Sequence, residues 1–329
     1  MAVAQESING PALVIGATGF IGRFVADACL DSGHTTYVLV TAGGKSPIRA
    51  ASIEALREKG AIIIEGRINE KEFIEQKLKE YGIEVVISSV GGTNILDQLT
   101  LIEAVKAVGT VKRFLPSEFG HDIDKANPVE PGLTLYNEKR RVRRAIEAAG
   151  IPYTYICCNS IAGWPYFDNK HPSEVTPPLD RFQIYGDGNG RAFYVAGNDI
   201  GKLTIKAAYD LRTSNKTVHF RPASNLLSLN EMASLWESKI GRKLPRTTLT
   251  EEDLLSIAAE NIYPGSIVAS LTHDIFINGC QTNFNIDGQD EIEIGDLYPD
   301  MALRTIDECF DDYISNLNLK QDFDENLKE

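Results

Sequence analysis

Short runs of β-branched and aliphatic residues alternate with longer amphipathic segments through the first half of the chain. The short runs predict strands at residues 13–15, 36–40, 61–64, 85–88, 113–115 and 153–157. The amphipathic segments predict helices near residues 21–31, 48–59, 70–80, 96–108 and 133–149. Strands linked by helices require crossover connections, which make neighbouring strands parallel. The pattern therefore predicts an α/β fold with a doubly wound parallel sheet.

A glycine-rich turn follows the first predicted strand. It comprises Gly16, Thr18, Gly19, Phe20, Ile21 and Gly22. Glycines spaced three apart let backbone N–H groups approach a pyrophosphate, and the helix N-terminus behind them favours an anion. The turn predicts a Rossmann-type dinucleotide site, with tight packing as the alternative explanation.

A chain of 329 residues is long enough for a large domain and a smaller one. We expect residues 10–160 to form the dinucleotide-binding domain and residues 161–315 to form a smaller, interleaved substrate domain. A segment near residues 192–212 is expected to return to the first domain. The acidic residues 316–329 are predicted to form a flexible tail.

Charge and cysteine content exclude several classes of protein. A net charge of −13 argues against binding nucleic acid or an anionic membrane surface. The first residues lack the pattern of a signal peptide, and no apolar run reaches the roughly 18 residues of a membrane span, so we expect a cytoplasmic protein. Five cysteines and five histidines without ligand spacing predict neither disulfides nor a metal site.

The loop after the second strand bears on the choice between NAD and NADP. An NAD site usually places a carboxylate about 20 residues beyond the glycines, but residues 40–49 contain no acidic residue. Lys45 and Arg49 stand where a 2′-phosphate would bind, whereas Thr41 stands where an arginine would be a better clamp. NADPH is the expected cofactor, and a solvated loop with two surface cations is the alternative.

Loops after later strands carry further candidates. Ser89, Val90 and Gly91 follow the fourth strand, where small residues would let a nicotinamide pass over the sheet or would simply end the strand tightly. His121 follows the fifth strand, with two carboxylates nearby. A histidine in a loop is more often structural, unless a neighbouring group needs a proton.

The helix predicted after His121 brings two more candidates. Tyr136 and Lys139 are three residues apart, so they share one face of this helix. The spacing differs from the Tyr-x-x-x-Lys of short-chain dehydrogenases, and that assignment of roles does not transfer. The basic run at residues 140–144 is interpreted as the solvated side of the helix, and Lys139 could belong to it.

Several stretches resemble a family of plant reductases. They are Arg-Phe-Leu-Pro-Ser-Glu-Phe-Gly at residues 113–120, Ile-Cys-Cys-Asn at 156–159 and Thr-His-Asp at 272–274. Nearly the whole chain resembles the NmrA-like, atypical short-chain dehydrogenases that include the isoflavone, pinoresinol–lariciresinol and phenylcoumaran benzylic ether reductases. Within that family it looks like the leucoanthocyanidin reductases.

The resemblance implies an NADPH-dependent reductase of flavonoid and proanthocyanidin biosynthesis. Its expected partner is a small polyphenol, a flavan-3,4-diol, which would lose its C4 hydroxyl to give a quinone methide and then a 2,3-trans-flavan-3-ol. The family's catalytic lysine falls on Lys139, as the base for a phenol, and a histidine matching His121 assists it. The chain is expected to be a monomer or a homodimer.

Two sets of site residues follow from the motifs and the resemblance. The cofactor-binding set is Gly16, Thr18, Gly19, Phe20, Ile21, Gly22, Thr41, Lys45, Arg49, Ser89, Val90, Gly91, Lys139 and Asn159. The substrate-binding set is His121, Tyr136, Ser160, Gly163, Trp164, Pro165 and His273. Packing between domains is the alternative role for the stretch that begins at Ser160, and a strand entry is the alternative for His273.

Two other functions stay open at this point. A related reductase of lignans, phenylcoumarans or isoflavones would share the cofactor site and Lys139. A non-catalytic sensor of NADP would bind the cofactor without transferring a hydride.

Overall fold

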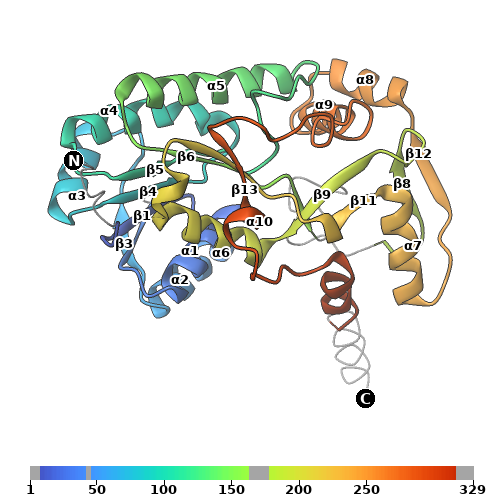
Figure 1. The fold of residues 1–329 in the computed structure, drawn as a ribbon, viewed down its shortest axis with the longest axis horizontal. Coiled ribbons are helices and arrows are strands. Elements are labelled where there is room, and N and C mark those ends of the chain that lie inside the picture. Colours follow the sequence, from blue (N-terminus) through green and yellow to red (C-terminus); the bar gives the residue numbers. More distant parts are fainter. Residues whose placement is uncertain (1–7, 42–45, 163–177, 316–329) are drawn as a thin grey trace.

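The computed structural model describes residues 8–41, 46–162 and 178–315. Its centre is a five-stranded parallel sheet in the order β3-β2-β1-β4-β5 (Figure 1). The strands are β1 (Ala12–Ile15), β2 (Thr36–Val40), β3 (Ile62–Glu65), β4 (Val85–Ser88) and β5 (Arg113–Leu115). Strand order reverses beside β1, so the crevice at the carboxyl ends of β1 and β4 is the expected ligand position. The doubly wound parallel sheet is confirmed.

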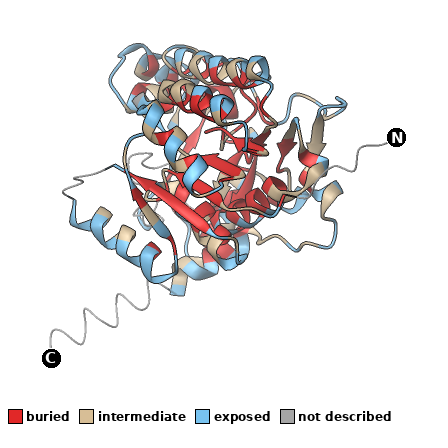
Figure 2. Cartoon of the chain, turned by 90° about the vertical axis from the view of Figure 1, so that its left-hand side faces the viewer, coloured by how far each residue is buried: buried red, intermediate tan, exposed pale blue. Residues whose placement is uncertain are grey.

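Helices cover both faces of this sheet (Figure 1). One face carries α1 (Phe20–Asp31), α2 (Pro47–Glu58) and α6 (Gly197–Tyr209), and the other carries α3 (Lys71–Glu80), α4 (Gln98–Val108) and α5 (Gly132–Ala149). Side chains alternate between the faces of a strand. Ala12 and Val14 therefore join one core, and Leu13 and Ile15 join the other. Figure 2 shows the strands buried between helices with exposed outer sides.

The sixth predicted strand, β6 (Thr154–Cys157), joins the central sheet only through an isolated bridge between Phe114 and Tyr153. Its full pairing is with β10 (Lys216–His219), which in turn pairs with β13 (Glu291–Glu293). These pairings are parallel, and they tie the second half of the chain to the first. The helix α6 packs against α1 so closely that a Cβ at Gly201 would lie 2.1 Å from the carbonyl oxygen of Phe24.

A separate apolar core lies in the second half of the chain, around Trp236 and Phe310. Its strands are β7 (Ser160–Ala162), β8 (Phe182–Tyr185), β9 (Arg191–Ala196), β11 (Leu226–Ser228) and β12 (Arg246–Leu249). Its helices are α7 (Leu229–Ile240), α8 (Glu251–Ala259), α9 (Gly265–Phe276) and a segment at residues 306–315. Shorter helical turns are η1 (Gly92–Asp97), η2 (Leu211–Thr213), η3 (Ala223–Asn225) and α10 (Ile294–Leu297).

The alternative interpretation of His273 as a strand entry is wrong, because it lies inside α9, whose apolar face includes Ile275 and Phe276. The division at residues 160 and 161 stays a prediction. The expected tail at residues 316–329 lies outside the described residues. None of the helices in the described ranges combines the length and apolar character needed to cross a membrane.

Candidate active site

The glycine turn between β1 and α1 leaves room for a ligand at the sheet edge. Gly16 has φ of +83°, in the left-handed region that favours glycine. A Cβ at Gly22 would lie 2.0 Å from the carbonyl oxygen of Gly16, so the helix can approach the turn only without a side chain there. The backbone N–H of Gly19 donates to the same oxygen at 2.9 Å. The result is a rigid turn in front of a helix N-terminus, a geometry that suits a pyrophosphate.

A cavity of about 280 Å³ lies in front of this turn. Eight predicted cofactor residues line it, namely Gly16, Thr18, Gly19, Thr41, Arg49, Ser89, Val90 and Gly91. The Nε atom of Arg49 is buried without a hydrogen-bond partner. A buried, unpaired guanidinium donor is costly, and a phosphate group in the cavity would satisfy it. The residues present therefore fit a dinucleotide with a 2′-phosphate. Lys45 lies outside the described residues.

Hydrogen bonds join the three loops that surround the cavity. The hydroxyl of Ser89 donates to the carbonyl oxygen of Ile15 at 2.8 Å, which fixes the end of β4 against β1. The hydroxyl of Ser117, after β5, donates to the carbonyl oxygen of Val90. The cavity is thereby connected to the loop that carries His121.

Asn94, Gly66 and Ile68, which no motif in the sequence indicated, also line the cavity from the loops after β3 and β4.

Three predicted residues come together beside this loop. The hydroxyl of Tyr136, on α5, is hydrogen bonded to Nε2 of His121. Lys139, one turn further along α5, donates from Nζ to the carbonyl oxygen of Glu118 at 2.8 Å. His121 and Tyr136 are buried, and Lys139 is half-buried. We refer to His121, Tyr136 and Lys139 as the acid–base group.

Burial shifts the pKa of each member of the acid–base group. Desolvation, reinforced by the nearby Lys139 charge, lowers the pKa of His121 to about 3, so its imidazole is neutral at pH 7. Desolvation also lowers the pKa of Lys139 and raises that of Tyr136 well above its ordinary value. Burial thus favours the neutral amine form of Lys139 more than exposure to water would. A general base must be in this unprotonated form to accept a proton.

Two neighbours of His121 were not among the residues predicted from the sequence. A ring nitrogen of His121, a carboxylate oxygen of Asp274 and Sγ of Cys280 lie within 4.8 Å of one another. The sequence did contain an indication of Asp274, because this residue belongs to the Thr-His-Asp stretch. His273, which was selected from that stretch, instead contacts Glu251, with 3.0 Å between Nε2 and Oε1.

The interpretation of residues 140–144 as a solvated face is wrong for Arg143. Its side chain is 1% exposed and forms ion pairs with Glu118 and Asp122 at 2.8 Å. The neighbouring Arg144 is exposed, as expected. The carboxylates that pair with Arg143 lie on the loop after β5, too distant in sequence for helical periodicity to reveal.

The remaining predicted residues have other placements. Asn159 has φ of +58°. Its side-chain amide donates to the backbone carbonyl oxygen of Phe220 at 2.9 Å, so this side chain fixes the segment after β10. The hydroxyl of Ser160 accepts a hydrogen bond from Gln281 at 2.9 Å. Phe20 and Ile21 form the first turn of α1. Gly163, Trp164 and Pro165 lie outside the described residues.

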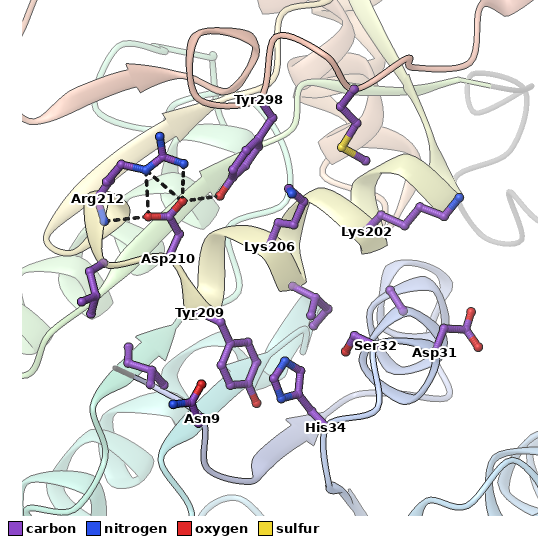
Figure 3. A pocket seen from close by; sticks show the side chains of 15 residues that line it. Asn9, Asp31, Ser32, His34, Lys202, Lys206, Tyr209, Asp210, Arg212 and Tyr298 are labelled. Atoms are coloured by element: carbon purple, nitrogen blue, oxygen red, sulfur yellow. Dashed lines mark hydrogen bonds and ion pairs between the residues drawn. The ribbon is translucent and has the colours of Figure 1, made fainter. Parts of the chain in front are cut away.

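A larger cavity of about 950 Å³ lies at the amino ends of the strands (Figure 3). The rings of His34 and Tyr209 stack at its side, 3.6 Å apart, and Asp210 binds Arg212 and Tyr298. Its lining contains none of the predicted site residues that the structure describes. The smaller cavity, at the edge where parallel sheets bind ligands, is therefore the candidate site.

Fold and site define a Rossmann-type dinucleotide-binding protein with an acid–base group beside the cofactor cavity. The family model described as "NmrA-like family" matches residues 10–310. The chain belongs to the NmrA-like family.

Its relatives include several plant reductases. It is 62% identical over 302 residues to leucoanthocyanidin reductase of Desmodium uncinatum, covering 92% of this chain and 79% of that protein. It is 44% identical over 303 residues to a phenylcoumaran benzylic ether reductase of Ginkgo biloba, covering 92% of this chain and 98% of that protein. A solved binary complex of leucoanthocyanidin reductase with NADPH from Vitis vinifera is 59% identical, with a TM-score of 0.89, covering 93% and 100% of the two chains.

Proposed function

We propose that this chain is an NADPH-dependent leucoanthocyanidin reductase, which converts a flavan-3,4-diol to a 2,3-trans-flavan-3-ol. The observation that carries the proposal is the acid–base group at the carboxyl edge of the sheet, joined through Ser117 to the cofactor cavity. The similarity to reductases of this name supports the choice of substrate. NADPH, when bound, supplies the hydride that C4 receives.

The substrate explains why a base is needed. The C4 hydroxyl is a poor leaving group, and the ring has no carbonyl for a hydride to attack. Removing a proton from the phenol para to C4 lets its electrons expel that hydroxyl, which produces a quinone methide that is electrophilic at C4. Lys139 is the base in this proposal, because burial lowers its pKa and its Nζ is held by a neutral carbonyl.

The departing hydroxyl needs a proton, and His121 supplies it in this proposal. A pKa of about 3 keeps its imidazole neutral, so the ring has a single N–H to donate. The hydrogen bond to the Tyr136 hydroxyl orients the ring. Lys139 returns its proton to the phenolate that hydride transfer leaves, and His121 regains its proton from solvent, which supplies the one proton that the overall reduction consumes.

Product analysis tests the proposed function. The purified protein is incubated with NADPH and, separately, with leucocyanidin, a phenylcoumaran and pinoresinol. We expect catechin from leucocyanidin and no product from the other two. Turnover of a lignan or phenylcoumaran alone would move the assignment to those reductases, and NADPH binding without any turnover would support a sensor.

We also propose that the protein acts in the cytoplasm as a monomer or homodimer. The five cysteines, all unpaired and buried in the described part of the chain, support a reducing compartment. Light scattering coupled to size-exclusion chromatography measures the oligomeric state.

A further inference from the structure

Arg143 holds the loop after β5 on both sides of His121. Its Nη2 lies 2.8 Å from Oε2 of Glu118, and its Nε lies 3.2 Å from Oε1 of the same carboxylate. Its Nη1 lies 2.8 Å from Oδ1 of Asp122. Both carboxylates are buried. Paired donors on a planar guanidinium fix the orientation of a carboxylate more strictly than a single charge does.

Glu118 connects this ion pair to the acid–base group. Its side chain is taken by Arg143, while its backbone carbonyl accepts the hydrogen bond from Nζ of Lys139. Lys139 and Arg143 are one turn apart on α5. Two positive side chains of one helix therefore contact different parts of Glu118. Arg143 binds its carboxylate, and Lys139 binds its neutral backbone carbonyl.

We propose that Arg143 is a positioning residue: by binding the carboxylates of Glu118 and Asp122, it keeps Lys139 against a neutral carbonyl and His121 against Tyr136. The proposal rests on the role of Lys139 in the proposed function. Arg143 acts through the loop, and it is not itself a catalytic residue.

A bound metal ion would be another way to neutralise this region. Asp122, Cys157 and His219 have ligand-type atoms within 4.8 Å of one another. The guanidinium of Arg143 already occupies the position of a cation, with Nη1 on Asp122 and Nη2 at 3.7 Å from Sγ of Cys157. Burial also raises the pKa of Cys157 well above its ordinary value, so the group is a thiol and a poor ligand.

Removing Arg143 changes the charges that Lys139 faces. The charged and titratable groups around Lys139 are Glu118 and His121 on the loop, Tyr136 and Arg143 on α5, and Cys157 and Cys158 at the end of β6. Without Arg143, the carboxylate of Glu118 loses its partner and becomes available to Lys139. A carboxylate beside an amine favours the ammonium form, so the pKa of Lys139 would rise.

The pH dependence of kcat tests this proposal. Arg143→Gln is expected to move the midpoint of the rising limb upward by about one pH unit and to lower kcat about 10- to 100-fold. The double variant Glu118→Gln, Arg143→Gln removes both charges, and it is expected to bring the midpoint back toward that of the wild type. Arg141→Gln, an exposed change on the same helix, is the matched control and should leave both quantities unchanged.

A second measurement does not depend on the substrate. Competitive acetylation with acetic anhydride, read at the Lys139 peptide by mass spectrometry, follows the ionisation of Lys139 directly. An upward shift in Arg143→Gln, absent in Arg141→Gln, supports the proposal even if leucocyanidin is not the substrate. An unchanged Lys139 midpoint in Arg143→Gln would overturn it.

Arg143→Lys covers the case in which Arg143→Gln does not fold. It keeps the positive charge but loses the planar fork, so we expect a wild-type midpoint with kcat lowered about tenfold. Wild-type kcat in Arg143→Lys would contradict a positioning role. The melting temperature of each variant shows whether it is folded.

Discussion

At the scale of single residues, the site combines groups whose ordinary behaviour is altered by burial. His121 is neutral because its imidazole is desolvated, and Lys139 is a weaker base than in water for the same reason. Both pKa shifts arise from contacts that form only on folding. The sequence could therefore indicate these residues as candidates, but their protonation states could not be predicted from it. Arg143 is buried, although the basic residues around it in the sequence indicated a solvated helix face.

Lys139→Met tests the base. Its side chain has similar length but cannot accept a proton, so we expect kcat to fall about 10²- to 10⁴-fold. The dissociation constant for NADPH, measured by fluorescence titration, should stay near that of the wild type, because Lys139 does not line the cofactor cavity. Turnover close to the wild-type rate with intact NADPH binding would remove Lys139 from the mechanism.

Arg49→Glu tests the phosphate contact. The change replaces a buried, unpaired donor at the cavity with a carboxylate, which would repel a 2′-phosphate. We expect NADPH binding to weaken about 10- to 100-fold, in line with the strength of charge-assisted hydrogen bonds, with little effect on NADH. Arg57→Glu, at an exposed position on the same helix, is the matched control. Equal losses for both cofactors would show that Arg49 does not contact the phosphate.

At the scale of elements, local periodicity predicted most of the first half. The segments 36–40, 85–88 and 113–115 match β2, β4 and β5, and α5 begins one residue before its predicted start. Hydrophobic runs carry this information because they reflect burial on both faces of a parallel sheet. The partners of β6 could not be predicted in this way. Its pairing with β10 joins segments about 60 residues apart, which no local pattern encodes.

Gly22→Ala tests the junction of β1 and α1. A methyl group 2.0 Å from the carbonyl oxygen of Gly16 must displace the turn. We expect NADPH binding to weaken at least tenfold and the melting temperature to fall by several degrees, since overpacking costs about 1–3 kcal/mol. Gly265→Ala is the control, because a Cβ there meets nothing within 4 Å. A Gly22→Ala protein with unchanged NADPH affinity would contradict the close approach.

At the scale of the whole molecule, the second half of the chain completes the site without contributing to the glycine turn. α6 covers the central sheet beside α1 (Figure 1), while α9 brings Asp274 close to His121. The resemblance in sequence identified the Thr-His-Asp stretch as informative. Only the fold shows which of its residues reaches the acid–base group, because the stretch and His121 are about 150 residues apart.

Stability should fall in mild acid. His121 and His219, whose ordinary pKa is 6.5, have values lowered mainly by burial to about 3 and about 4. Below pH 6.5 these two histidines bind protons in the unfolded chain but stay neutral in the folded chain. The free energy of unfolding therefore decreases as pH falls through this range. Two such groups predict a loss of about 2 kcal/mol between pH 6 and pH 5.

Urea unfolding at a series of pH values measures this dependence. The double variant His121→Asn, His219→Asn removes both groups and should flatten the curve over the same range. A wild-type protein equally stable at pH 7 and pH 5 would show that these histidines are protonated in the folded state.

NADPH carrying deuterium at its transferable position tests hydride transfer to C4. The wild-type protein is supplied with this cofactor and leucocyanidin, and the product is analysed by NMR and mass spectrometry. We expect catechin with one deuterium at C4. Catechin without deuterium at C4, or deuterium at another carbon, would contradict hydride transfer to the carbon that the acid–base group activates.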